Sequence, residues 1–224
     1  MRVRSLDASE VSRQNKDATV PVNVNHFRNM VKKTDIDGLP AAVAALKAGF
    51  LIAFPTDTVY GVAADPRVEG AREKLYEAKK REPRKPVPVL ISNSAVAEKW
   101  GGAFSNAARL LSERFWPGPV TLVLPVGESF EGFRVPRHPV AMAILEAAGG
   151  ALYTTSANLS GQPPVGSAQE AQSALAPFVR AILEGRPHPS GRESTVVKVV
   201  GEQVVVLREG AVPKKEIEAC VNKS

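Results

Sequence analysis

The stretch that decides the fold is FLIAFPTDTVYG, residues 50–61. Its first five residues are apolar without interruption, which is typical of a strand buried on both faces of a sheet. Pro55 is expected to end the strand, because proline lacks the N–H that a ladder hydrogen bond needs. The hydroxyl-rich loop from Thr56 to Gly61 would then follow the carboxyl end of a strand, where open α/β sheets bind their ligands.

Apolar patterns on both sides of this stretch alternate between the periods of helix and strand. We predict helices over residues 39–48, 66–76, 104–115, 140–148 and 168–183, strands over 87–91, 120–124 and 151–154, and a hairpin of 195–200 with 203–207. Asp65 and Pro66 are expected to open the second helix as its cap and first-turn residue. This alternation, with one antiparallel portion, predicts an α/β fold whose twisted, mixed parallel and antiparallel sheet is flanked by helices.

The composition fits one globular domain of 224 residues, with 44% hydrophobic and 23% charged residues. Residues 1–33 are polar and lack periodicity, so we predict a loosely ordered N-terminal arm there and one domain over 34–224. No apolar run approaches the roughly 20 residues that a membrane span needs, so we expect no membrane association. A single cysteine, Cys220, excludes an intrachain disulfide, and a reducing cytoplasmic location is expected.

The charge balance points to an anionic partner and away from a protein-built metal site. Lys and Arg exceed Asp and Glu by six, which favours nucleotides, phosphate or nucleic acid as ligands. The three histidines and the one cysteine are scattered, with no spacing typical of metal ligands. We therefore predict no metal held by side chains of the protein, and any metal would arrive with a substrate.

Three polar segments are candidates for a binding site. By composition alone, the basic run KKREPRKP, residues 79–86, favours a helix cap with a solvated surface. Its two prolines, however, would hold several cations in one stiffened loop, as a polyphosphate site requires. TTSAN, residues 154–158, follows a predicted strand, so its hydroxyls and those after Pro55 could face one cavity or could only bond their own backbone. Arg134 offers a guanidinium that can bind a carboxylate with two hydrogen bonds.

Taken together, residues 38–221 resemble the YrdC family, the threonylcarbamoyl-AMP synthases. The resemblance rests on six motifs in order: PTDTVYG (55–61), KxR (79–81) with KP (85–86), WPGPVT (116–121), RVP (134–136), TSANLSG (155–161) and ESTVV (193–197). It implies a single YrdC-like catalytic domain that joins L-threonine, bicarbonate or CO2, and ATP into threonylcarbamoyl-AMP and pyrophosphate. This nucleotidyl transfer begins the threonylcarbamoyladenosine (t6A) modification of tRNA.

The resemblance also implies a role for ten residues. Lys79 and Arg81 would be catalytic and would bind the ATP phosphates, and the ATP site would further include Lys85, Ser156, Asn158 and Arg208. Threonine would be bound by Thr58, Arg134, Thr154 and Ser194. Mg2+ would accompany the ATP, and the expected partners are the downstream tRNA threonylcarbamoyl transferase proteins, with possible contact to tRNA or double-stranded RNA.

Two features depart from the family pattern, and two other functions stay open. The segment Pro125 to Arg134 is shorter than usual, and Lys198 stands where an aspartate is common. A module that binds double-stranded RNA or tRNA without catalysis would show steep salt dependence and no response to threonine. YrdC-like units also occur in carbamoyltransferases for hydrogenase maturation, in which carbamoyl phosphate supplies the carbamoyl group.

Overall fold

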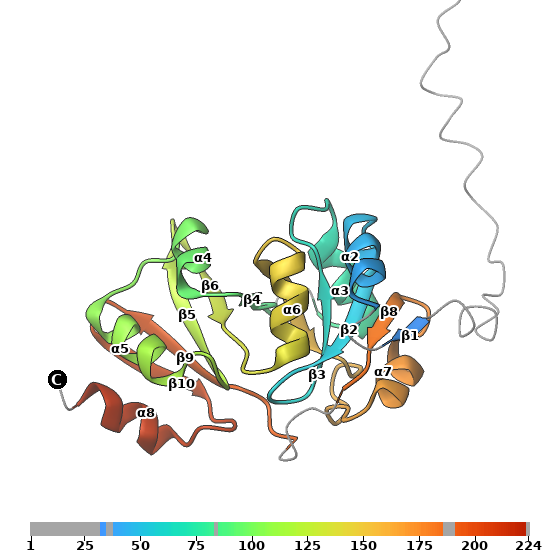
Figure 1. Ribbon diagram of the computed structural model, residues 1–224. Helices are drawn as coiled ribbons and strands as arrows, with labels where there is room; N and C mark the ends of the chain where they lie inside the picture. The colour runs from blue at the N-terminus through green and yellow to red at the C-terminus, as the bar shows by residue number, and fades with distance from the viewer. Residues whose placement is uncertain (1–31, 35–37, 83–84, 186–190, 223–224) are drawn as a thin grey trace, which may run out of the picture.

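The computed structural model describes residues 32–34, 38–82, 85–185 and 191–222. Within these ranges the strands form one sheet of ten, in the order β1-β8-β2-β3-β7-β4-β6-β5-β9-β10, with helices packed on it (Figure 1). Parallel pairs, such as β2 with β8, and antiparallel pairs, such as β2 with β3, occur in the same sheet. The prediction of a mixed α/β sheet flanked by helices is therefore confirmed.

The strands and helices have the following bounds. The strands are β1 Lys32–Thr34, β2 Leu51–Pro55, β3 Tyr60–Ala64, β4 Val89–Ile91, β5 Val120–Val126, β6 Ser129–Arg134, β7 Ala151–Ser156, β8 Val179–Leu183, β9 Thr195–Val200 and β10 Gln203–Arg208. The helices are α2 Leu39–Lys47, α3 Ala71–Lys79, α4 Ser94–Lys99, α5 Asn106–Phe115, α6 Pro139–Ala147, α7 Ala168–Leu175 and α8 Lys214–Val221.

The first half of the sheet, β8-β2-β3-β7, has helices on both faces. Strand β2 is buried at all five positions, as its uninterrupted apolar sequence predicts, and Pro55 is its last residue. Ile52 and Phe54 pack with α2 and α6 on one face, whereas Leu51 and Ala53 pack with α3 and α7 on the other. In this half β3 lies between β2 and β7 and is antiparallel to both, so β2 and β7 run in the same direction and end at the same edge of the sheet.

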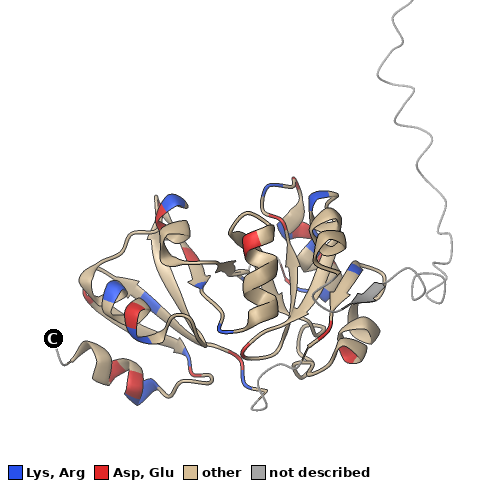
Figure 2. Ribbon diagram, in the orientation of Figure 1, with Lys and Arg blue, Asp and Glu red and all other residues tan. Residues whose placement is uncertain are grey.

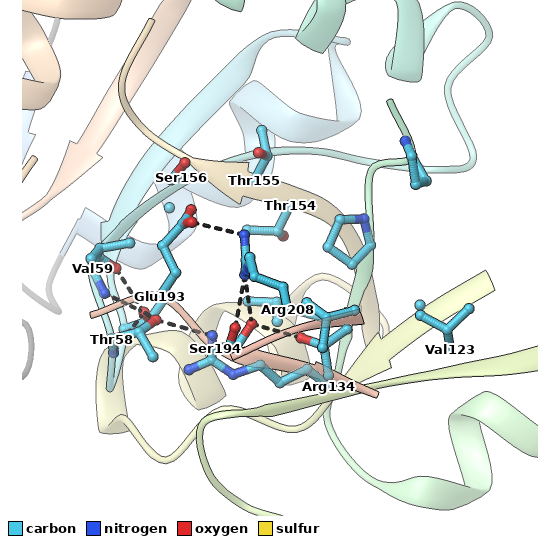
Figure 3. Close-up of a pocket in the computed structure, with 18 of the residues that line it drawn as sticks. Thr58, Val59, Val123, Arg134, Thr154, Thr155, Ser156, Glu193, Ser194 and Arg208 are labelled. Atoms are coloured by element: carbon cyan, nitrogen blue, oxygen red, sulfur yellow. Dashed lines mark hydrogen bonds and ion pairs between the residues drawn. The ribbon is translucent and has the colours of Figure 1, made fainter. Parts of the chain in front are cut away.

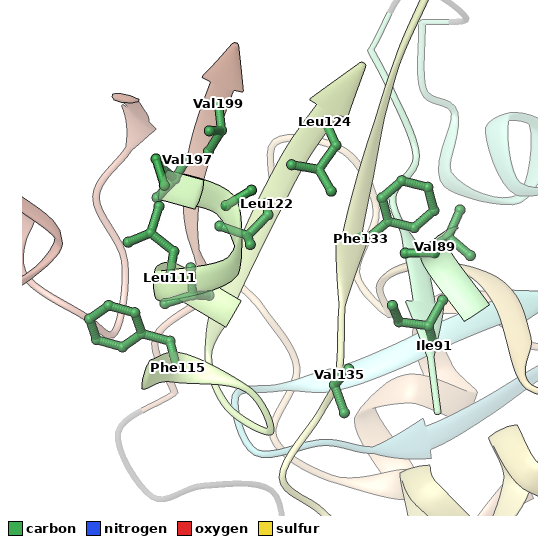
Figure 4. Close-up of a cluster of buried hydrophobic side chains, with 14 of the residues drawn as sticks. Val89, Ile91, Leu111, Phe115, Leu122, Leu124, Phe133, Val135, Val197 and Val199 are labelled. Carbon is green, nitrogen blue, oxygen red and sulfur yellow. The ribbon is translucent and has the colours of Figure 1, made fainter. Parts of the chain in front are cut away.

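In the second half, β4-β6-β5-β9-β10, the described helices pack mainly on one face; on the other face, Leu90 of β4 belongs to the cluster that includes α2 and α6. Alternate residues of β5, Val120, Leu122 and Leu124, are fully buried in a cluster with helices α4, α5 and α8 (Figure 4). Side chains of a strand alternate between its two faces, so Thr121 and Val123 lie on the opposite face. The opposite face of this half is therefore available to form a wall of a cavity.

The structure corrects two predicted helices and adds six elements that the sequence analysis did not predict: β1, β3, β6, β8, α4 and α8. Residues 168–183 do not form one helix: α7 ends at Leu175, and β8 follows. Helix α3 starts at Ala71 after Gly70, not at Pro66, because Asp65 accepts hydrogen bonds from Arg67 and caps a turn. Strand β3 begins at Tyr60, inside the loop predicted to run to Gly61, and extends to Ala64.

The N-terminal segment is described only from Lys32. Strand β1 pairs in parallel with β8, so the sheet begins two residues inside the segment predicted as an arm, and residues 1–31 lie outside the described ranges. The short segment from Pro125 to Arg134 is a hairpin, in which Val126 pairs with Ser129 across Gly127 and Glu128. No helix in the described ranges combines the length and apolar character needed to cross a membrane.

Candidate functional site

A cavity of about 380 Å3 lies where the two halves of the sheet meet (Figure 3). Its floor is the helix-free face of β5, β6 and β9, with Val123 and Val196 among the lining residues. Three segments complete the wall: the end of β7 with its hydroxyls, the segment after α3, and the end of β10. The lining thus combines an apolar floor with hydroxyls and cations, as expected for a small-molecule site.

Arg134 is fixed at the floor of this cavity by three oriented hydrogen bonds. Its Nη2 donates to Asp57 Oδ1 at 2.5 Å, its Nη1 to Thr58 Oγ1 at 3.0 Å and its Nε to the carbonyl of Gly118 at 3.0 Å. Burial lowers the pKa of Arg134, and the adjacent Asp57 carboxylate opposes that shift. The guanidinium is therefore held in one orientation before any ligand arrives, which suits recognition of a planar carboxylate.

The hydroxyls beside Arg134 are themselves held in place. Thr56 and Thr58 share a hydrogen bond of 2.9 Å between their Oγ1 atoms, and Thr56 Oγ1 also donates to the carbonyl of Val59 at 2.7 Å. This is the local bonding that the sequence left open as an alternative, and it occurs together with the contact to Arg134. The loop after β2 is thus ordered by its own hydroxyls and contributes to the cavity at the same time.

Arg208 reaches the cavity from the end of β10. The register between β9 and β10 shifts between Val206 and Arg208, and such a bulge redirects the side chains that follow it. Its Nη1 donates to Glu193 Oε2 at 2.7 Å, and its Nη2 donates to the carbonyl of Ser194 at 2.8 Å. Ser194 Oγ in turn lies 2.8 Å from Thr121 Oγ1, which links Arg208 to the cavity floor.

Arg81 and Lys85 bring positive charge to the opposite wall. Arg81 donates to the carbonyl of Pro86 at 3.0 Å and to Thr155 Oγ1 at 3.4 Å, so it ties the segment after α3 to the end of β7. Burial lowers the pKa of Arg81, and the nearby carboxylate of Glu193 opposes that shift. Lys85 lines the cavity with an exposed side chain. Basic and acidic positions are interspersed over both halves of the protein (Figure 2). The cations that line the cavity, and not the net charge of the chain, therefore favour binding of an anion at this site.

Lys79, which the resemblance places at the ATP phosphates, is not among the residues that line the cavity. Its side chain is 1% exposed, and its Nζ donates to the backbone carbonyls of Ser156 and Asn158, the latter at 2.8 Å. Burial lowers its pKa to about 8, and the positive charge of Arg81 adds to that shift. Lys79 therefore lies behind the cavity wall and fixes the chain that leaves β7.

Eight of the ten predicted site residues line the cavity; the two that do not are Lys79 and Asn158. The amide of Asn158 donates to the carbonyls of Leu159 and Gln162, at 3.0 and 2.6 Å, so it shapes the turn after β7. Three contributors received no predicted role: Asp57, Thr121 and Glu193. Asp57 directly precedes Thr58 in the motif PTDTVYG, and Glu193 directly precedes Ser194 in the motif ESTVV. Their position beside predicted site residues could have indicated from the sequence that they belong to the site.

The site offers a bound metal few ligands of its own. Among the described residues, no group of three or more His, Cys, Asp or Glu side chains is placed to hold a metal ion. The cavity has cations, hydroxyls and one carboxylate in its described lining, a set that fits an anion and not a bare metal ion.

Comparisons with known proteins agree with this geometry. Residues 44–210 match the model of the Sua5, YciO and YrdC proteins, which is described as "Telomere recombination". The threonylcarbamoyl-AMP synthase of Bacillus subtilis is 36% identical over 191 residues, which cover 80% of this chain and 55% of that protein. The chain thus spans about half the length of this relative.

Solved structures share the fold. The Pyrococcus abyssi Sua5 protein, solved in complex with L-threonine, superposes with a TM-score of 0.79 at 31% identity, covering 85% of this chain and 60% of that one. Escherichia coli YciO superposes with a TM-score of 0.74 at 23% identity, covering 84% of this chain and all of that one. The likeness to YciO concerns the fold alone, whereas the likeness to the Sua5 protein extends to the sequence.

Proposed function

Because the chain belongs to the Sua5, YciO and YrdC family, we propose that it is a threonylcarbamoyl-AMP synthase. The reaction would join L-threonine, bicarbonate or CO2, and ATP into threonylcarbamoyl-AMP and pyrophosphate. The observation that carries the proposal is the cavity, which combines one immobilised guanidinium, Arg134, with the separate cations Arg81, Lys85 and Arg208. A site that binds one amino acid and one polyphosphate needs one cation for the carboxylate and separate cations for the phosphates.

The chemistry asks for positioning and charge neutralisation. A carbamate oxygen of N-carboxythreonine attacks the α-phosphorus of ATP, the new O–P bond forms, and the bond to the β-phosphate bridging oxygen breaks to release pyrophosphate. Two anions must approach each other, so cations in fixed places lower the barrier by stabilising the charge on the phosphates. Mg2+ would enter as part of the ATP substrate and neutralise phosphate charge.

We assign the two substrates to two sides of the cavity. Arg134 would bind the threonine carboxylate, with Thr58, Thr154 and Ser194 as hydrogen-bonding groups around the amino acid. Arg81, Lys85, Arg208 and Ser156 would hold the nucleotide. Thr58 and Ser194 are buried and already bonded to Arg134 and Thr121, so their hydroxyls have fixed positions, which supports a role in orientation.

Lys79 and Asn158 would act as positioning residues in this scheme. Both hold the chain after β7, Lys79 through backbone carbonyls and Asn158 through the turn to Gln162. Ser156 lines the cavity and belongs to the same segment, so a shift of the backbone there would displace a group proposed to contact the nucleotide. The role proposed for Lys79 is thus indirect, and it replaces direct contact with the phosphates.

The decisive test is pyrophosphate release by the purified full chain with Mg2+, bicarbonate and ATP, comparing L-threonine, L-serine and no amino acid. Strict dependence on threonine and bicarbonate is expected. Arg134→Lys provides a matched variant, since it keeps the charge but loses the planar fork, and should raise the KM for threonine more than that for ATP. Tight binding of double-stranded RNA without any threonine-dependent release would favour the RNA-binding function instead.

We also propose the cellular context that the family implies. The product would pass to the proteins that transfer the threonylcarbamoyl group to tRNA, in the cytoplasm. A single cysteine and no membrane-crossing helix in the described ranges are compatible with that setting. Purified chain supplied with unmodified tRNA and the transferase proteins should yield t6A only when L-threonine and ATP are present.

A further inference from the structure

Glu193 is the one carboxylate among the described residues that line the cavity, and it lies where an anionic ligand would bind. Its Oε2 accepts a hydrogen bond of 2.7 Å from Arg208 Nη1, as Figure 3 shows. The same carboxylate is close enough to Lys79 and Arg81 to raise the pKa of both against the effect of burial. One negative charge therefore lies near two cations of the cavity wall, Arg81 and Arg208, and near Lys79 behind that wall.

The backbone around Glu193 is fixed. A Cβ on Gly210 would lie 2.3 Å from the carbonyl oxygen of Glu193, so only glycine permits the close packing of these two segments. The amide of Ala211 donates to that same carbonyl at 2.9 Å, and Thr195 Oγ1 accepts from the amides of Gly210 and Val212. The position from which the side chain extends is thus set by the fold.

The ion pair itself is exchangeable. The side chains of Arg208 and Glu193 are 46% and 36% exposed, and pairs this exposed contribute little to folding stability. Arg208 keeps a second anchor in the Ser194 carbonyl, so its guanidinium stays in place when the carboxylate leaves. A rotation of the Glu193 side chain would free Arg208 without disturbing the strands.

We propose that Glu193 is a displaceable internal anion, which occupies Arg208 until the phosphates of a polyphosphate ligand take its place. This inference rests on the proposed function only for the identity of the ligand as ATP. Exchange of carboxylate for phosphate at Arg208 leaves the number of ionic contacts there unchanged. The favourable free energy of binding must then come from contacts of the ligand with Arg81 and Lys85. Glu193 therefore makes the site select ligands with several anionic groups over single anions.

The test is a comparison of affinities by calorimetry, without threonine and at low salt. Sodium tripolyphosphate in metal-free buffer is the probe, because it needs no recognition of adenine or Mg2+. Glu193→Gln should lower its Kd about two- to fivefold, the value of one exposed ion pair. Glu128→Gln is the matched control, since it removes the same charge from the exposed β5–β6 turn outside the cavity and should leave Kd unchanged.

A double-mutant cycle separates displacement from plain repulsion. In an Arg208→Ala background the effect of Glu193→Gln should vanish; an effect that persists in full would show that Glu193 only repels the ligand. An unchanged Kd in Glu193→Gln, or no binding by either protein, would overturn the inference. Weaker binding of MgATP by Glu193→Gln, with unchanged binding of tripolyphosphate, would make Glu193 a metal ligand and would also overturn it.

The proposed function fails by a different result. If the wild-type protein binds tripolyphosphate but releases no pyrophosphate in the presence of threonine, bicarbonate and ATP, the synthase assignment is lost. The Kd comparison between wild type and Glu193→Gln is unaffected by that outcome, because it uses neither threonine nor turnover.

Discussion

Arg134 and Asp57 form an ion pair inside the protein, with 7% and 9% of their side chains exposed and 2.5 Å between Nη2 and Oδ1. The two residues are far apart in the sequence: Asp57 lies in the loop after β2, and Arg134 is the last residue of β6. The second carboxylate oxygen of Asp57 is buried and has no hydrogen-bond partner. The pair therefore leaves one polar atom unsatisfied, as expected for a group retained for orientation at a site and not for stability.

Loss of the Asp57 charge should weaken both the fold and threonine binding. Asp57→Asn leaves the Arg134 cation buried without a counter-charge, and breaking such a pair costs about 3 kcal/mol. Urea denaturation should show that loss, and titration calorimetry should show a higher Kd for threonine. Glu218→Gln removes one member of an exposed pair with Lys214 and should cost less than about 1 kcal/mol. Equal effects of the two variants would contradict the role of Asp57.

Lys79 should make the stability of the protein depend on pH above 8. Its pKa in the folded protein is about 8, against roughly 10.4 in an unfolded chain. Between these values the unfolded chain binds more protons, so the free energy of unfolding rises with pH, by up to about 3 kcal/mol. This contribution is fully present above the unfolded pKa and is lost as the pH falls through 8.

The measurement is denaturant unfolding of wild type and Lys79→Met from pH 7 to pH 10.5. The difference between the two free energies of unfolding removes the titration of all other groups, and it should move in favour of the wild type as pH rises. A difference that stays constant over this range would place Lys79 in solvent, in conflict with its 1% exposure.

Lys85 should affect activity without affecting stability. Its side chain is exposed and lines the cavity, so Lys85→Ala should change the free energy of unfolding by no more than about 0.5 kcal/mol. Initial rates of pyrophosphate release should show a higher KM for ATP and an unchanged KM for threonine. The control is Lys215→Ala on the exposed side of α8, whose kinetics should match the wild type. Identical kinetics for both variants would remove Lys85 from the phosphate site.

Gly210→Ala should disturb the cavity through the backbone. The added Cβ would lie within 2.6 Å of three backbone atoms of Glu193 and Ser194, so these segments must separate. Overpacking of this kind costs about 1–3 kcal/mol, and thermal unfolding should occur at a lower temperature. Gly166→Ala meets nothing closer than 3.9 Å and should leave the melting temperature nearly unchanged. A fully stable Gly210→Ala with normal ATP affinity would contradict the close packing.

The sequence predicts a helix or strand most accurately where the residue pattern is compatible with only one type of secondary structure. The apolar run before Pro55 could only be a buried strand, and β2 is buried throughout. Strand β3 was missed because Gly61, Ala63 and Ala64 have little strand preference and are held in the sheet by partners on both sides. The single helix predicted over 168–183 ignored Pro177, which cannot occupy a helix interior and in fact separates α7 from β8.

The sequence motifs indicate which residues lie near the cavity, but they do not indicate which of these side chains are buried behind its wall. A motif shows that Lys79 and Arg81 lie near each other, but their exposure depends on how α3 ends. Lys80 adopts a left-handed conformation with φ of 49° at that end, and Lys79 is directed inward while Arg81 faces the cavity. The motifs place Asp57 and Glu193 beside predicted site residues, but their ion-pair partners, Arg134 and Arg208, lie in other segments, so the pairs themselves are visible only in the structure.

The polypeptide passes between the two halves of the sheet three times, between α3 and β4, between β6 and α6, and between β8 and β9. Each half is thus built from two separate stretches of chain, and cavity residues such as Arg81, Arg134 and Glu193 lie at or beside these passages. A single genetic crossover within this region would mix parts of both halves. Neither half corresponds to one continuous gene segment, so neither could be exchanged between genes as a single piece.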